Sequence, residues 1–201
     1  MWPRSTAIRF AALNATQIHA LSTTQIGALE ATDVAEFTTT QLAALSTTQV
    51  QALTADNLAA LDGDQIGAFN VTQIARLTTT ALSGLDATQV AALSSTQVRA
   101  LTTTQIAALD STDIAEFEAA QVAAFTTTQI QAWSTTVIDG LGETQIQAFA
   151  VTQIPSLTIT QLDHLSTTNI SAFDTTQVYA FTSTQVASLD GAQLEAYLAA
   201  V

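Results

Sequence analysis

The side chains that could support acid–base or nucleophilic chemistry are few and widely spaced. His19 and His164 are the only histidines of the 201-residue chain. Asp163 directly precedes His164, and the two could form one edge of a catalytic arrangement. A hydrolase would also need a positioned nucleophile, and no nucleophile motif accompanies this pair. We therefore expect both histidines to be surface residues without a catalytic role.

Two pairs of carboxylates recur at a spacing of one helical turn. Asp33 and Glu36 form the first pair, and Asp113 and Glu116 form the second. An acid–base pair would need a cleft and two contrasting environments. The simpler interpretation is that Asp33 and Asp113 lie near the N-terminus of a helix, where the helix dipole favours negative charge. We expect these aspartates to replace a capping glutamine.

A third group of oxygen ligands lies around Gly63 and consists of Asp56, Asn57, Asp62 and Asp64. Their spacing does not match the calcium-binding loop of EF-hand proteins. The chain contains no cysteine, so disulfides and thiolate metal sites are excluded. The sequence thus assigns no catalytic, cofactor-binding or metal-ligating residue, and we do not expect an enzyme.

An eight-residue repeat determines the elements that would position any site. From Leu13 to Ala196 the chain divides without insertion into 23 octads with the consensus L-x-x-T-Q-I-x-A. Position 1 is always Leu, Phe or Trp, position 6 is Ile, Val or Leu, and position 5 is Gln in 17 octads. Such regularity predicts a solenoid over residues 13–196, preceded by a degenerate segment 1–12 and followed by an apolar tail 197–201.

The octad predicts a short capped helix. Position 2 is Ser, Thr, Asp or Asn in 19 octads and is usually followed by Gln three residues later, which is the pattern of a capping box. One continuous helix is excluded, because two turns per octad would require about 4.0 residues per turn. At 100° per residue, positions 1, 5, 6 and 8 share one face and positions 3 and 7 lie opposite. The predicted fold class is an all-α solenoid.

A β-solenoid is the alternative fold. The Thr-Thr-Gln-Ile segment is β-prone, and Pro155 would remove an amide donor inside a predicted helix. Rows of threonine would also suit an ice-binding surface, although we expect the threonines at positions 2 and 4 to cap or stack. The large residues at position 1, such as Phe37, Trp133 and Phe173, are expected in the core. Two octads per turn, in layers about 8–10 Å apart, would give a rod of about 100 Å.

The charge balance excludes several classes of partner. The chain has 17 acidic residues, no lysine and a formal net charge of −13. Its four cations, Arg4, Arg9, Arg76 and Arg99, are too few to bind nucleic acid or anionic lipid. No segment approaches the roughly 20 apolar residues of a membrane helix. The first ten residues also lack the apolar core of a signal peptide.

The segment Leu45–Leu53, which reads L-S-T-T-Q-V-Q-A-L, resembles the octapeptide repeat tracts of large bacterial surface or secreted proteins. The resemblance implies an extracellular or cell-surface spacer, adhesin-like stalk or matrix protein, and it supplies no functional residues. Apolar residues near both ends suggest either a fragment of a longer array or head-to-tail self-association, which would build filaments. The alternative function is a scaffold that presents positions 3 and 7 to a protein or glycan.

Overall fold

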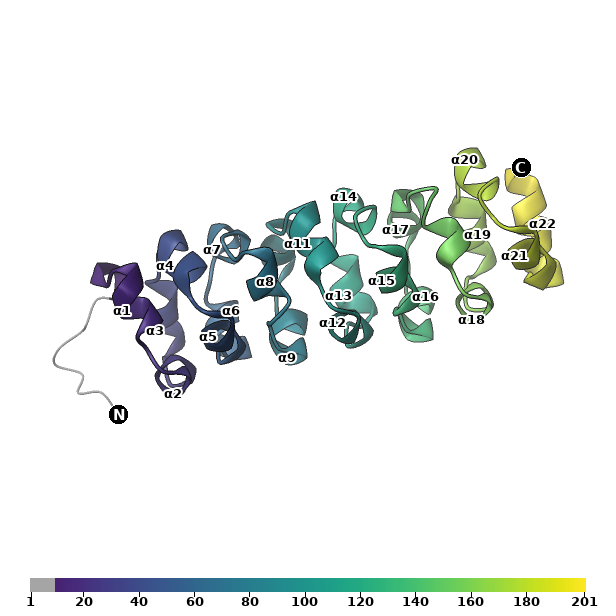
Figure 1. Ribbon diagram of the computed structural model, residues 1–201. Helices are drawn as coiled ribbons and strands as arrows, with labels where there is room; N and C mark the ends of the chain where they lie inside the picture. Colours follow the sequence, from purple (N-terminus) through teal and green to yellow (C-terminus); the bar gives the residue numbers. More distant parts are fainter. Residues whose placement is uncertain (1–9) are drawn as a thin grey trace. The chain divides into compact units, whose positions relative to one another are not determined.

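The computed structural model describes residues 10–201 (Figure 1). The chain divides into two compact units, Met1–Leu93 and Ser94–Val201. Every regular element in the described part of the chain is helical, with one short helix in nearly every octad. The predicted all-α solenoid is therefore confirmed, and the β-solenoid alternative is wrong. The part of the degenerate segment before Phe10 lies outside the described residues.

The helices of the first unit are η1 (Phe10–Ala12), α1 (Ala15–His19), α2 (Thr23–Gly27), α3 (Ala31–Ala35), α4 (Thr39–Ala44), α5 (Thr47–Gln51), α6 (Ala55–Ala59), α7 (Gly63–Gly67), α8 (Val71–Ile74), α9 (Thr79–Ser83) and α10 (Ala87–Ala91). The helices of the second unit are α11 (Ser95–Ala100), α12 (Thr103–Ala107), α13 (Ser111–Ala115), α14 (Ala119–Val122), α15 (Thr127–Gln131), α16 (Thr135–Asp139), α17 (Glu143–Ala148), η2 (Ile154–Ser156), α18 (Ile159–Leu162), α19 (Thr167–Ala172), α20 (Thr175–Val178), α21 (Ser183–Ser188) and α22 (Gly191–Ala200).

The predicted capping box starts most of these helices. In α15, Thr126 has an extended backbone, and its hydroxyl accepts a hydrogen bond from the Gln129 amide at 3.2 Å. The Thr126 amide in turn donates to Gln129 Oε1 at 2.7 Å. Helices this short are unstable alone, so the cap can only define where each helix begins. Packing between octads must supply the remaining stability.

The core of each unit is built from positions 1 and 6. The position-6 side chains are buried in all but the last two octads, and the position-1 side chains are buried from Phe37 onward. Phe37, Trp133 and Phe173 are 1%, 3% and 3% exposed, which confirms their predicted place in the core. In the second unit the rings of Phe125 and Trp133 meet edge to face, with centroids 5.4 Å apart.

The outer surface is formed by positions 2, 3, 4 and 7. No residue at position 3 or 7 is buried in the described octads, as the helical wheel predicts. Position 4 is exposed in every octad, although we expected its threonines to stack. In the first unit, however, the Thr88 Cγ2 atom lies 3.8 Å from a Cβ added at Gly63 one turn earlier, so an exposed position-4 threonine can still contact the neighbouring turn.

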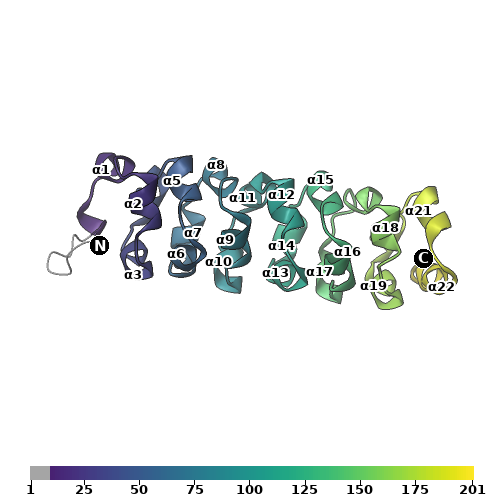
Figure 2. The same ribbon diagram turned by 90° about the horizontal axis from the view of Figure 1, so that it is seen from below.

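Each turn of the solenoid contains three octads. In the first unit α3 packs on α6 and α7 packs on α10, and in the second unit α14 packs on α17 and α19 on α22. Figure 2 shows α2, α5 and α8 side by side along one face of the first unit. Two octads per turn, the geometry used to estimate a rod length, is therefore wrong. The sequence period defines the octad but not which octads meet across a turn.

Pro155 changes one octad locally. The segment from Ile154 to Ser156 forms the 3-10 helix η2 in place of an α-helix, with Pro155 in its first turn, where no amide donor is needed. At the end of the chain, α22 extends into the predicted apolar tail as far as Ala200. The Tyr197 ring on this helix packs against Phe181 with centroids 5.7 Å apart.

Candidate functional site

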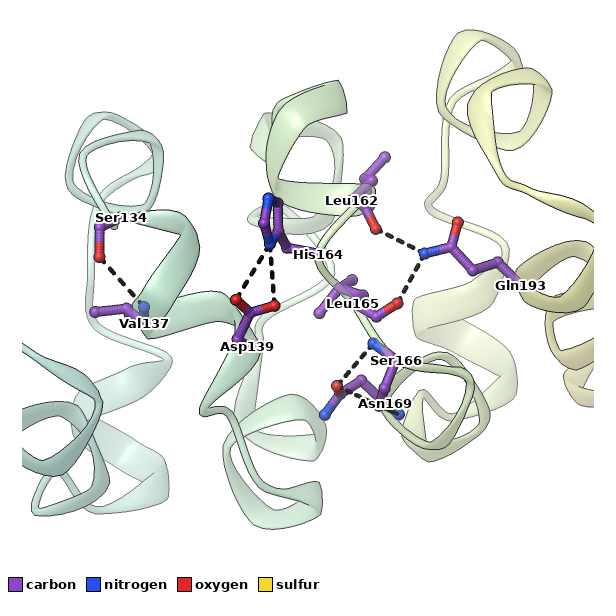
Figure 3. Close-up of polar contacts among 9 residues, drawn as sticks. All are labelled: Ser134, Val137, Asp139, Leu162, His164, Leu165, Ser166, Asn169 and Gln193. Carbon is purple, nitrogen blue, oxygen red and sulfur yellow. Dashed lines mark hydrogen bonds and ion pairs between the residues drawn. The ribbon is translucent and has the colours of Figure 1, made fainter.

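The most regular polar arrangement in each unit is formed by the side-chain amides at position 5. Gln193 is 4% exposed, and its Nε2 donates to the carbonyls of Leu162 at 2.9 Å and Leu165 at 2.7 Å (Figure 3). These acceptors precede the glutamine by 31 and 28 residues and belong to the previous turn. We call the set of position-5 amides that donate to carbonyls 28–31 residues earlier the amide ladder. Its members are Gln41, Gln49, Asn57, Gln65, Gln73 and Gln89 in the first unit, and Gln129, Gln153, Gln161, Asn169, Gln177, Gln185 and Gln193 in the second.

Each glutamine of the amide ladder satisfies backbone groups at two places. Gln129 Oε1 accepts the cap amide of its own helix, and its Nε2 donates to the carbonyls of Val98 at 2.9 Å and Leu101 at 2.7 Å. These carbonyls lie at the C-terminal end of α11, where the Val98 carbonyl also accepts the Leu101 amide at 3.2 Å. Buried polar groups need partners, so the glutamine both starts a helix and bonds one turn of the solenoid to the next.

Side-chain length decides how many carbonyls are reached. Asn57 is one methylene shorter than glutamine and donates to a single carbonyl, that of Leu29, at 3.0 Å. Asn169 likewise donates to the Leu141 carbonyl at 2.7 Å. Sequence reasoning predicted the capping half of this arrangement and missed the inter-turn half. The available signal was the preference for Gln over Glu in an acidic chain, because a cap needs only the oxygen.

His164 is paired with Asp139 and not with the adjacent Asp163. Its Nδ1 lies 3.0 Å from Asp139 Oδ1 and 3.2 Å from Oδ2, across one turn of the second unit (Figure 3). The two side chains are 40% and 56% exposed. The hydroxyl of Ser166, seen in the same view, donates to the Asn169 side chain within a capping box. The pair is thus an exposed inter-turn contact with no enclosing cleft.

The other predicted site residues are dispersed among structural roles. His19 is exposed at the end of α1. Asp33 Oδ2 accepts the cap amide of Glu30 at 3.1 Å, and Asp113 Oδ2 accepts that of Asp110 at 2.9 Å. The expectation that these aspartates replace the capping glutamine is confirmed. Glu36 and Glu116 lie at the opposite ends of the same two helices, as their C-caps.

The oxygen-rich group around Gly63 also separates by role. Asp62 caps α7 by accepting the Gln65 amide at 2.8 Å, whereas Asn57 is buried in the amide ladder. Asp56 and Asp64 are exposed in the first turns of α6 and α7. Across residues 10–201, no three His, Cys, Asp or Glu side chains come together in a group that could hold a metal ion.

One open hollow of about 290 Å³ lies in the second unit and is lined by Arg99, Phe125, Thr127 and Thr152 among others. The Arg99 Nε donates to the carbonyl of Ala124 at 3.2 Å, just beyond the end of α14. A cation is favourable at the C-terminus of a helix. This guanidinium therefore has a structural contact, and the hollow beside it holds no second charged side chain.

The geometry defines a class: a helical solenoid of tandem short repeats, joined turn to turn by side-chain amides. The family model described as ALTTAQ repeat matches the chain seven times and covers well over half of it. The matches span residues 10–39, 26–63, 34–71, 71–103, 88–119, 114–151 and 154–190. The chain belongs to the ALTTAQ repeat family. No curated protein matches it.

The family description can be followed in the octads themselves. Residues 100–105 read A-L-T-T-T-Q, from position 8 of one octad to position 5 of the next. The stretch thus includes the position-2 cap and ends on the glutamine, as the capping box requires. Among the described helices, none is long and apolar enough to cross a membrane.

Proposed function

We propose that the chain is a non-enzymatic structural repeat protein that serves as a rigid spacer or stalk outside the cell or at its surface. The amide ladder is the observation that carries this proposal. Glutamine is the recurrent residue with the richest hydrogen-bonding chemistry, and its amide is buried in bonds that hold successive turns together. The recurrent side chains at positions 1, 2, 5 and 6 are therefore committed to building the solenoid.

Rigidity is the property that a spacer must have, and it can be measured inside the second unit. The chain has no native cysteine, so two introduced cysteines can be spin-labelled selectively. Thr128 and Thr176 are exposed at position 4 of octads that lie two turns apart. Pulsed electron paramagnetic resonance should give one narrow distance peak at about 16–20 Å plus the label length, since packed helical layers are about 8–10 Å apart.

A broad distance distribution under native conditions would contradict the rigid-spacer role. The same labelled chain in concentrated urea provides the control, because it must give the broad distribution expected of an unfolded segment. A second label pair at Thr128 and Thr152, one turn apart, should give a distance shorter by one layer. Equal distances for the two pairs would contradict a regular stack.

Self-association is the filament-forming version of the same proposal. Leu198 and Val201 are 62% and 50% exposed near the end of α22, and both are apolar. Sedimentation velocity over a hundredfold range of concentration distinguishes the two versions. Oligomers whose size increases with protein concentration, and which are absent in a Leu198→Glu variant, support head-to-tail association. A protein that stays monomeric at every concentration supports a spacer. Fractionation of cells that make the chain tests the proposed surface location.

A binding scaffold is the second candidate function, and one exposed aromatic residue favours it. Tyr179 at position 7 is 67% exposed, and Val151 and Ile159 at position 3 are 42% and 39% exposed. Tyrosine is enriched among residues that dominate binding energy. A glycan array and a cross-linking screen with the wild type and a Tyr179→Ser variant test this role. A signal that the variant abolishes would favour binding, and a signal shared by both would be non-specific.

A further inference from the structure

The amide ladder of the second unit has one interruption. Nine octads of this unit have both the position-5 residue and its two potential acceptor carbonyls within residues 94–201. Seven of these donate across the turn: Gln129, Gln153, Gln161, Asn169, Gln177, Gln185 and Gln193. The two that do not are Val137 and Gln145, which belong to consecutive octads. Each turn contains three octads, so two of the three inter-turn amide contacts are missing at one joint.

Val137 has no side-chain amide, and the side-chain amide of Gln145 makes no hydrogen bond to the previous turn. Val137 occupies the buried position normally taken by glutamine but has no amide to offer. Gln145 Oε1 accepts the Gly142 amide at 3.1 Å, yet its Nε2 donates to no carbonyl in the described part of the chain. By the regular spacing, the carbonyls left without these donors are those of Ile106 and Leu109, and of Ile114 and Phe117.

Other features weaken the same two octads. Gly142 starts α17 without a side-chain cap, and Asn169 returns only one hydrogen bond, to Leu141, from the following turn. Trp133 is 3% exposed, and its Nε1 is buried without a hydrogen-bond partner in the described structure. A buried unpaired donor destabilises the closed arrangement relative to one in which water reaches it.

Apolar packing is what closes this joint. Helix α13 packs on α16 and α14 packs on α17, as in the other turns. At Gly140 the backbones come so close that an added Cβ would overlap the Cβ of Ser111. Packing of this kind is short-ranged and is lost once the layers separate. The joint therefore has close contact but few directional bonds to restore it.

We propose that the joint between residues 106–117 and residues 133–147 is where the second unit opens first, as a built-in yield point. Local opening is favoured where fewer hydrogen bonds hold neighbouring segments together, and repeat arrays can open between neighbouring turns. Its biological use rests on the proposed spacer function: a stalk with one such joint gives way at a defined place under load. The opening itself does not depend on that function.

Native-state hydrogen exchange with mass spectrometry tests the proposal on the full chain. In the wild type, backbone amides in α13 and α16 should exchange at least tenfold faster than those in α15 and α20. Val137→Gln supplies an amide to the Ile106 and Leu109 carbonyls and an oxygen to the Ser134 amide. This variant should slow exchange in α13 and α16 by about tenfold, whereas Val137→Met, similar in size but without an amide, should not.

Two further measurements test the yield point if Val137→Gln fails to fold. Gln153→Met creates a third missing contact and should extend the fast-exchanging region into α14. With Trp2 replaced by Phe, the emission of Trp133 should shift to longer wavelength at a lower urea concentration than the loss of helical circular dichroism. Uniform exchange across the unit, or equal effects of the Gln and Met variants at residue 137, would overturn the yield point. Narrow spin-label distances together with uniform exchange would overturn it alone and leave the spacer function intact.

Discussion

Replacing one glutamine of the amide ladder is the most direct test of how the solenoid is held together. Gln129 is 3% exposed and makes three hydrogen bonds with the backbone, to the Thr126 amide and to the carbonyls of Val98 and Leu101. Gln129→Met keeps the length and volume of the side chain but removes all three. Each lost hydrogen bond to the backbone costs about 1 kcal/mol, although the Val98 carbonyl keeps its bond from the Leu101 amide. We expect a loss of about 3 kcal/mol in the free energy of unfolding of the second unit.

The chain offers a matched control two residues away. Gln131 lies on the same helix α15 at position 7 and is exposed, so Gln131→Met should change the free energy of unfolding by less than about 0.5 kcal/mol. Urea unfolding followed by circular dichroism, with hydrogen exchange in α11 and α15 as the local measurement, compares the two variants. A loss for Gln129→Met no larger than that for Gln131→Met would refute the amide ladder as a source of stability.

A glutamate at position 129 distinguishes the acceptor role of the glutamine side chain from its donor role. Gln129→Glu retains an oxygen for the Thr126 amide but directs a second oxygen toward the Val98 and Leu101 carbonyls. At neutral pH this places a buried charge against two acceptors, so we expect a larger loss than for Gln129→Met. Near pH 4 the protonated carboxyl can donate one hydrogen bond, and the difference between the two variants should shrink. A Glu variant as stable as wild type at pH 7 would contradict the assigned donor role.

Three further predictions concern other contacts, and each is tested by urea unfolding against the wild type. Gly140→Ala should cost about 1–3 kcal/mol because the new methyl overlaps Ser111, and adding Ser111→Gly should restore most of the loss. A double-mutant cycle on Asp139 and His164 should give a coupling below about 1 kcal/mol that falls with added salt, since both side chains are exposed. Ala81→Gln should stabilise the first unit by about 1 kcal/mol through a new member of the amide ladder, whereas Ala81→Met should not.

The sequence predicts those parts of the structure that depend on near neighbours. The capping box joins residues three apart, so Thr126 and Gln129 reveal the start of α15 without any knowledge of the fold. Burial of Phe37 and Trp133 follows from their place in the octad. The β-solenoid could not be dismissed in advance, because threonine and isoleucine favour strands when taken one residue at a time. The capping box depends on pairs of residues three apart, and its repetition in most octads favours the helix over the strand.

The number of octads per turn and the amide ladder could not be predicted in the same way. Both depend on contacts 28 and 31 residues apart, such as Gln193 with Leu165 and Leu162. Neither distance is a multiple of eight, so the repeat itself shows no sign of them. The side chains with recognisable acid–base chemistry in the sequence are His164 and the carboxylates. The buried polar side chains of the described residues are instead the amides at position 5, most of them glutamines.

A third inter-turn contact, 25 residues apart, limits the space at position 8, which is most often alanine. Position 7 lies against position 8 of the octad that is three repeats later, a separation of 25 residues, as for Arg99 and Ala124. Where position 8 is His164, position 7 across the turn is Asp139, which binds it. Where position 8 is Gly140, the neighbour in the earlier turn is so close that no side chain fits. Substitutions in this family should therefore be judged in pairs 25 or 29 residues apart, because each turn of the solenoid sets the space available to the next.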